Sequence, residues 1–121
     1  MYTLQTILQK LGEHKPELQR KYSVSGIGVF GSYAREEATD QSDIDIAVEI
    51  TAPMGLDFIE MADEIETLFG VKTDVVPIRS IKPQYLEYVK KDIIYVWKKA
   101  FYVYNKSKKI IANFISWNYL R

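Results

Sequence analysis

Cysteine is absent from this 121-residue chain, and its absence excludes several kinds of chemistry. Without a thiol the protein has no disulfide, no thiolate metal site and no cysteine nucleophile. Histidine occurs only once, at His14, so a zinc site rich in histidine is excluded as well. The lack of cysteine fits a reducing compartment.

Long apolar runs are also missing. No stretch approaches the roughly 20 apolar residues that cross a bilayer, and residues 1–10 lack the basic segment and apolar run of a signal peptide. We therefore expect a cytoplasmic protein that does not associate with membranes.

Apolar residues make up 47% of the chain and charged residues 26%, as in an ordinary globular protein. The length predicts one folded domain.

Acidic residues are missing from one end of the chain. Residues 98–121 carry five lysines and one arginine but no acid, whereas residues 1–97 carry 10 basic and 16 acidic residues. We predict a domain over 1–97 followed by a basic, aromatic extension over 98–121. The acidic body disfavours general nucleic-acid binding. The extension could contact RNA through stacking and charge, but we favour packing on the body or docking to a protein partner.

Hydrophobic periodicity predicts alternating helices and strands. The expected elements are a helix over 3–20, a strand over 24–30, a short helix over 33–38, a strand over 43–50, a helix over 56–69, a strand over 71–78, a helix over 83–91 and a strand over 93–97. In the helix over 56–69 we expect the core-facing residues to be Leu56, Ile59, Ala62, Ile65 and Phe69. This order predicts an α/β (α+β) domain with helices flanking a small mixed sheet of about four strands.

Two aspartates begin the clearest strand. Asp43 and Asp45 project from the same face because side chains alternate along a strand. Two adjacent carboxylates repel unless a cation lies between them. Magnesium favours such oxygen ligands together with substrate phosphates, and two such ions can stabilise both oxygens of a phosphoryl transfer. The alternative is a solvated strand face, although the aliphatic opposite face fixes the register of the strand.

Gly31-Ser32 follows an apolar strand and precedes a short helical segment. A glycine there allows a ligand to approach the backbone closely, and the amides that open a helix attract anions. Ser32 adds a hydroxyl donor. Taken alone, this pair is weak evidence, because a Gly-Ser pair is usually an ordinary turn.

The two features together resemble a known signature. Gly31-Ser32 is followed by a spacer of ten residues and then by Asp43-Ile44-Asp45. This pattern resembles that of the DNA-polymerase-β-like nucleotidyltransferase superfamily. The fuller sequence pattern, from Gly-Ser-Tyr-Ala-Arg to Ser-Asp-Ile-Asp, is similar to that of the minimal nucleotidyltransferase (MNT) family. The resemblance in pattern covers about residues 20–97 and is most specific over 30–46.

The resemblance implies a third carboxylate on a neighbouring strand. Asp74 is the natural candidate, and its alternative role is a salt bridge with Lys72. Arg35 could bind phosphate through its planar fork, or it could pair with a nearby surface acid such as Glu36 or Asp40. The family commonly has glycine where this chain has Glu36, which suggests a local difference in the turn.

The resemblance also implies an activity and a partner. An enzyme of this family would bind ATP with Mg²⁺, two ions being expected, and transfer AMP to an acceptor hydroxyl. Asp43, Asp45 and Asp74 would form the metal site and the catalytic group, while Gly31, Ser32 and Arg35 would hold the nucleotide. Similar proteins are often antitoxins that modify a tyrosine of a HEPN-domain ribonuclease toxin. The alternatives are a non-catalytic antitoxin that acts by contact and an aminoglycoside-type nucleotidyltransferase. Homo- and hetero-oligomers both remain open.

Overall fold

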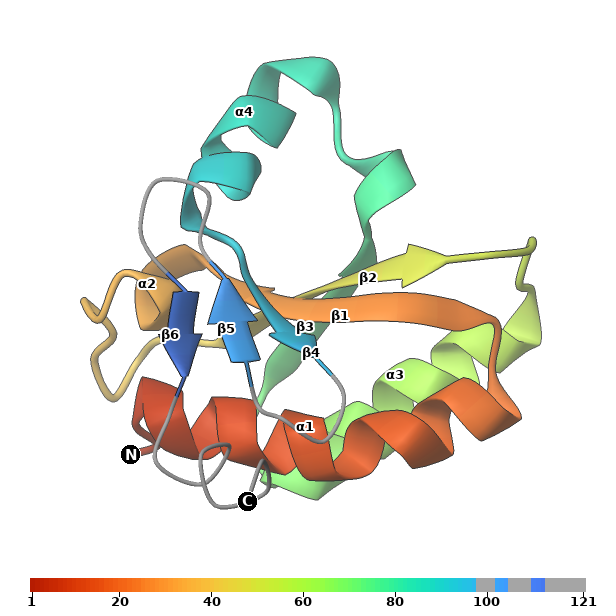
Figure 1. Cartoon of the computed structure of the whole chain (residues 1–121), viewed down its shortest axis with the longest axis horizontal. Coiled ribbons are helices and arrows are strands. Elements are labelled where there is room, and N and C mark those ends of the chain that lie inside the picture. The colour runs from red at the N-terminus through yellow and green to blue at the C-terminus, as the bar shows by residue number, and fades with distance from the viewer. Residues whose placement is uncertain (98–101, 105–109, 113–121) are drawn as a thin grey trace.

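A computed structural model describes residues 1–97, 102–104 and 110–112. The elements, in chain order (Figure 1), are α1 (Leu4–Lys21), β1 (Val24–Phe30), α2 (Gly31–Ala34), β2 (Ile44–Ile50), α3 (Leu56–Phe69), β3 (Thr73–Pro77), the 3-10 turn η1 (Ile78–Ser80), α4 (Pro83–Asp92), β4 (Ile94–Trp97), β5 (Tyr102–Tyr104) and β6 (Ile110–Ala112). None of the described helices is both long enough and apolar enough to cross a membrane.

The strands form one mixed sheet in the order β3-β2-β1-β4-β5-β6. Strand β1 is antiparallel to both β2 and β4, whereas β2 and β3 run parallel. The four predicted strands and the predicted fold class are confirmed. Two short strands, β5 and β6, continue the sheet beyond β4. They come from the segment predicted as an extension, and the domain boundary at residue 97 stays a prediction.

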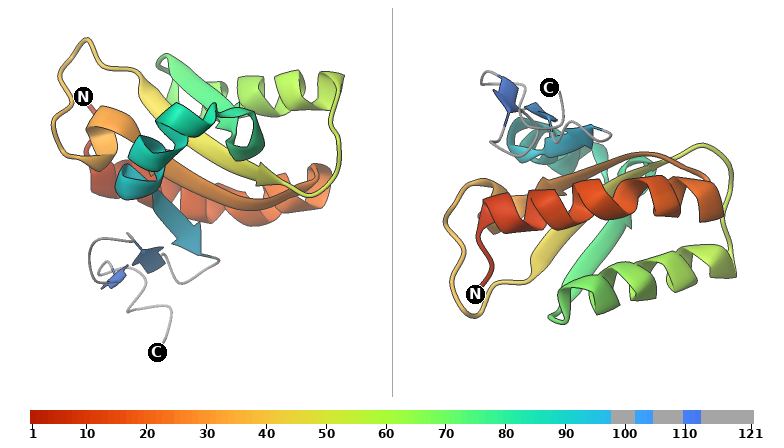
Figure 2. Two further views of the ribbon diagram at one scale, coloured as in Figure 1. Left: turned by 90° about the horizontal axis from the view of Figure 1, so that it is seen from above. Right: turned by 60° about the horizontal axis from the view of Figure 1, so that its bottom comes forward.

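Helices α1 and α3 cover one face of the sheet, and α4 lies on the other side (Figures 1 and 2). The covered face of β2 is the predicted aliphatic one, because Ile44, Ile46 and Val48 are fully buried in the core. The opposite face of β2 carries Asp45 and Ala47. We call this opposite side of the sheet, away from α1 and α3, the site face.

The predicted inner face of α3 is partly wrong. Ile65 and Phe69 are buried as expected, but Leu56 and Ile59 are 82% and 58% exposed, and Met61 is buried instead. At 3.6 residues per turn, Leu56 lies roughly 180° and Ile59 roughly 120° around the helix from Ile65. The buried stripe therefore recurs every four residues, and the two exposed side chains lie outside it.

The helix ends follow their local chemistry. Gly70 caps α3 in the left-handed region, at φ 69°, as its position predicts. Pro83 opens α4 at the first turn. The short helix predicted over 33–38 is wrong in its bounds, because α2 begins at Gly31 and ends at Ala34. The chain then turns at Glu36, which has a φ of 58°.

Candidate active site

Two of the predicted acids lie directly beside each other in the sheet. Strands β2 and β3 are parallel, and their register pairs Asp45 with Asp74. Asp43 precedes β2 by one residue and lies two residues before Asp45. Residues paired across neighbouring strands project from the same face. The sheet therefore gathers all three aspartates at the end where β2 and β3 begin.

The electrostatics of Asp45 reflect this crowding. Burial, followed by the negative charges of Asp74 and Asp43, raises the pKa of the Asp45 carboxyl to about 6, while the positive charge of Arg35 opposes the shift. Two nearby carboxylates and a partly buried position make the ionised form of Asp45 costly. A cation bound among these acids would remove much of that cost.

Gly31 brings the chain close to this acid cluster. It has a φ of 74°, and a side chain at this position would overlap Oδ2 of Asp45. Phe30, the residue before it, pairs with Asp45 across β1 and β2. Glycine is required here both by the backbone angle and by the lack of space. The turn that carries Gly31 and Ser32 therefore lies against the Asp45 carboxylate.

The basic residues near the cluster make different pairs from those considered in the sequence. Lys72 Nζ lies 3.5 Å from Asp43 Oδ2, and within the described part of the chain no ion pair joins Lys72 to Asp74. Arg35 donates to Glu37 and to Asp92 on α4 rather than to Glu36 or Asp40. The long-range partner Asp92 could not be found from sequence, because it lies 57 residues away.

Comparisons with known proteins identify the family of this chain. A family described as the nucleotidyltransferase domain matches residues 11–96. The chain belongs to the nucleotidyltransferase domain family. It is 41% identical over 97 residues to the protein adenylyltransferase MntA of Thermococcus cleftensis, covering 79% of this chain and 98% of that protein. The enzyme class predicted from the signature, a nucleotidyltransferase, is confirmed.

Solved structures place this nucleotidyltransferase more narrowly. A structure provisionally named a minimal nucleotidyltransferase superposes with a TM-score of 0.67 at 30% identity, covering 77% of this chain and 95% of that one. The MNT antitoxin complex with the tri-AMPylated HEPN toxin of Shewanella oneidensis also yields a match, with a TM-score of 0.58 at 22% identity, over 79% of this chain and 73% of the other. The second likeness shows a shared fold. The predicted membership of the minimal family is confirmed.

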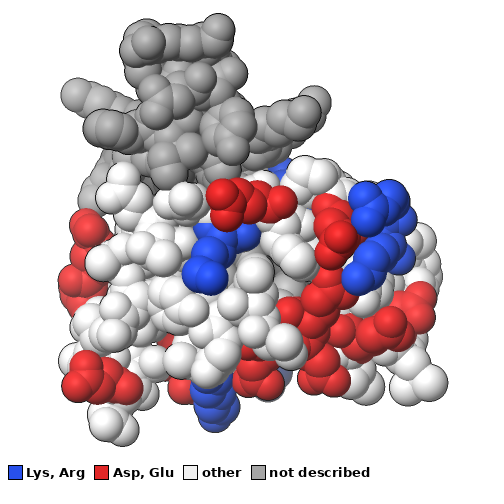
Figure 3. Space-filling view, turned by 90° about the horizontal axis from the view of Figure 1, so that it is seen from below, with Lys and Arg blue, Asp and Glu red and all other residues white. Residues whose placement is uncertain are grey.

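A separate polar cluster lies between α1 and α3, on the far side of this nucleotidyltransferase from the site face. Among the described residues, only His14, Glu17 and Glu64 bring three ligand atoms within 4.8 Å of one another. Glu64 already accepts hydrogen bonds from Lys21 at 2.7 Å and Tyr22 at 3.0 Å. Figure 3 shows this side of the molecule, with its acidic and basic side chains close together. The cluster links two helices and is distinct from the three aspartates.

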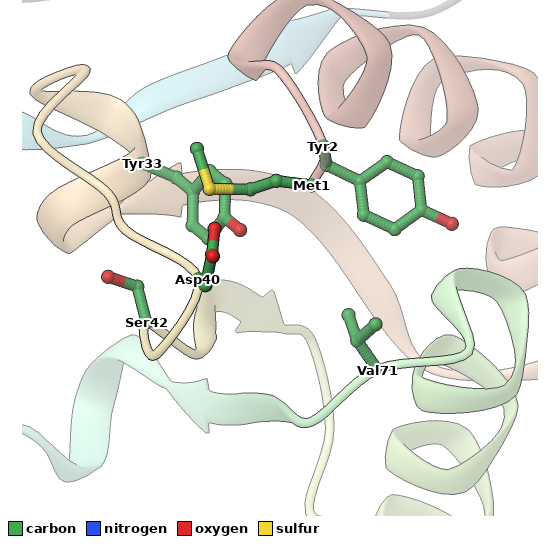
Figure 4. Close-up of a pocket in the computed structure, with 6 residues that line it drawn as sticks. All are labelled: Met1, Tyr2, Tyr33, Asp40, Ser42 and Val71. Atoms are coloured by element: carbon green, nitrogen blue, oxygen red, sulfur yellow. The ribbon is translucent and has the colours of Figure 1, made fainter.

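The sequence did not predict a cavity that lies at the end of the sheet where β2 and β3 begin. It measures about 430 Å³ and is lined by Met1, Tyr2, Tyr33, Asp40, Ser42 and Val71 (Figure 4). Ser42 is the residue before Asp43, and Tyr33 is the residue after Ser32. No sequence signal could have found this cavity, because its walls come from the N-terminus, α2, the loop before β2 and the turn before β3.

Proposed function

We propose that this enzyme transfers AMP from Mg-ATP to a hydroxyl of a partner protein and thereby acts as an antitoxin. The observation that carries the proposal is the pairing of Asp45 with Asp74 beside Gly31. Three acids at one end of the sheet, with Asp45 against the glycine turn, form a suitable site for a metal-bound triphosphate, because divalent cations join carboxylates to phosphate oxygens.

Each residue has a role in this proposal. Asp43 and Asp45 would hold magnesium, and Asp74 would complete the metal site. Bound Mg²⁺ would neutralise the charge that develops on the phosphate oxygens. Gly31 and Ser32 would hold the triphosphate through the backbone and the hydroxyl, and Arg35 would bind phosphate oxygens.

The proposed reaction replaces one bond to the α-phosphorus of ATP with another. The acceptor oxygen forms a bond to the α-phosphorus of ATP, and the bond from that phosphorus to the bridging oxygen breaks. Pyrophosphate leaves with the electron pair. The proton of the attacking hydroxyl passes to the Asp74 carboxylate, which acts as a general base positioned by its strand.

Support for a protein acceptor comes from the relatives. The Thermococcus cleftensis relative is named a protein adenylyltransferase. The Shewanella oneidensis structure with the same fold joins an MNT antitoxin to an AMPylated HEPN toxin. We therefore propose a tyrosine of a HEPN-type ribonuclease toxin as the acceptor.

Mass spectrometry tests this function. A HEPN-type ribonuclease toxin is incubated with the full chain, ATP and Mg²⁺, and its mass is measured. We expect one or more added AMP masses, and none with the Asp43→Asn/Asp45→Asn double variant. Asp63→Asn, an exposed change on α3, is the matched control and should retain activity. Tight binding of the partner without any added mass would instead indicate a protein that neutralises its partner by contact.

A further inference from the structure

Arg35 is held by two carboxylates that differ in exposure. Its Nη1 donates to Asp92 Oδ2 at 2.6 Å, and its Nε donates to Glu37 Oε1 at 3.0 Å. The Glu37 side chain is 66% exposed, whereas the Asp92 side chain is 22% exposed. Glu37 lies in the loop after α2, only two residues from Arg35. Asp92 is therefore the partner that connects Arg35 to a distant part of the fold.

The backbone around Asp92 is fixed by the sheet. Ile93, the next residue, is 4% exposed, and a side chain at Gly28 would come within 2.8 Å of its Cγ1. Ile94 then pairs with Val29 in the antiparallel ladder between β1 and β4. A buried isoleucine and a strand pairing thus follow Asp92 directly. The backbone of Asp92 is therefore anchored next to the sheet even though α4 buries none of its own residues.

Arg35 also lies close enough to influence the acid cluster. It caps the C-terminal end of α2, the helix that begins with Gly31 and Ser32. Its positive charge lowers the pKa of Asp45, against the effects of burial and the neighbouring acids. A guanidinium has five N–H donors, and the described residues accept from only its Nε and Nη1 atoms. Donors therefore remain for a ligand on Arg35.

We infer that Asp92 is a positioning residue that holds the Arg35 guanidinium in place for the phosphates of the nucleotide. The inference rests on the proposed function, since it concerns the same nucleotide site. A flexible arginine loses side-chain entropy when it binds a ligand, and a fixed carboxylate partner reduces that loss. Prior orientation of a binding group improves affinity without adding a contact. The opposite possibility is that Asp92 competes with phosphate for Arg35.

Calorimetric titration of the full chain with a non-hydrolysable ATP analogue and Mg²⁺ separates these outcomes. We expect Asp92→Asn to weaken binding about tenfold, which corresponds to about 1.4 kcal/mol. Asp92→Glu, which keeps the charge, should recover part of the affinity. Glu37→Gln should change the affinity less, because Glu37 is exposed in a loop and fixes Arg35 poorly.

A double-mutant cycle with Arg35→Gln identifies a positioning role. In the Arg35→Gln background, Asp92→Asn should cause no further loss of affinity, whereas a general structural defect would weaken binding in both backgrounds. Unchanged or tighter binding by Asp92→Asn, or equal effects of Asp92→Asn and Glu37→Gln, would overturn the inference. If Asp92→Asn fails to fold, Asp92→Glu and the Arg35→Gln variant decide the question. Failure of the wild-type chain to bind the analogue would overturn the proposed function itself.

Discussion

The Asp45 carboxylate lies against the backbone of Gly31, at a point where any side chain on residue 31 would overlap its Oδ2 atom. The left-handed φ of Gly31, 74°, adds a second reason for glycine. Substitution by alanine must therefore strain the backbone and displace the acid. This relationship connects the glycine turn to the acid cluster through physical contact.

Gly31→Ala should destabilise the protein by about 2–4 kcal/mol, combining backbone strain with overpacking. Nucleotidyl transfer should be lost as well, because Asp45 would move. Gly70→Ala is the matched control, since Gly70 has a nearly identical φ of 69°, but apart from its chain neighbours no described residue comes within 4 Å of an added Cβ. It should cost only about 1 kcal/mol and leave activity intact. Urea unfolding and transfer assays check both, and equal effects at the two positions would exclude the contact with Asp45.

Asp45→Asn should stabilise the metal-free protein while abolishing transfer. The folded-state pKa of Asp45, about 6, lies above its ordinary value. The folded state therefore binds more protons than the unfolded state between about pH 4 and 6, and the free energy of unfolding falls as pH rises through this range. The asparagine amide does not ionise, so the variant avoids this fall in the free energy of unfolding. We expect a gain of about 1 kcal/mol at pH 7.5, reduced by solvent screening at this partly exposed site.

Urea unfolding in a metal chelator, at pH 7.5 and at about pH 4, measures this effect. The gain should shrink at the lower pH, where the wild-type carboxyl is protonated. Added Mg²⁺ should stabilise the wild type and leave Asp45→Asn unchanged. A variant that is less stable than the wild type at pH 7.5 without metal would show that the acids do not repel as described.

Glu36→Gly should stabilise the turn after α2. Glu36 adopts a φ of 58°, a left-handed angle that glycine accepts readily and other residues adopt at a cost. We expect a gain of about 1 kcal/mol in the free energy of unfolding. Glu36→Ala is the control, because it removes the carboxylate but keeps the strained angle. Thermal unfolding compares the two, and an equal gain from alanine would point to the charge rather than to the backbone.

The double variant Leu56→Ser/Ile59→Ser should leave stability nearly unchanged, within about 0.5 kcal/mol, because both side chains are largely exposed. Ile65→Ala on the same helix should cost about 2–5 kcal/mol, since Ile65 is fully buried. Chemical unfolding of both variants tests the orientation of α3. A large loss from the serine double variant would show that the first turn of α3 packs against the core.

The sequence alone determined the local parts of this protein. Alternation over β2 placed Asp43 and Asp45 on one face and the isoleucines on the other, because side-chain direction along a strand has a period of two. The ten-residue spacing from Gly31-Ser32 to Asp43 carried the family resemblance. Gly70 and Pro83 marked helix ends through backbone preferences that depend on single residues.

Tertiary structure decided the remaining relationships, because they depend on segments that are distant in the chain. The parallel register that pairs Asp45 with Asp74 is set by how β2 and β3 align after α3. The pair between Arg35 and Asp92 depends on where the sheet places the end of α4. The buried stripe of α3 was misjudged because several stripes of that helix contain apolar residues. Packing against the sheet selects only one of them.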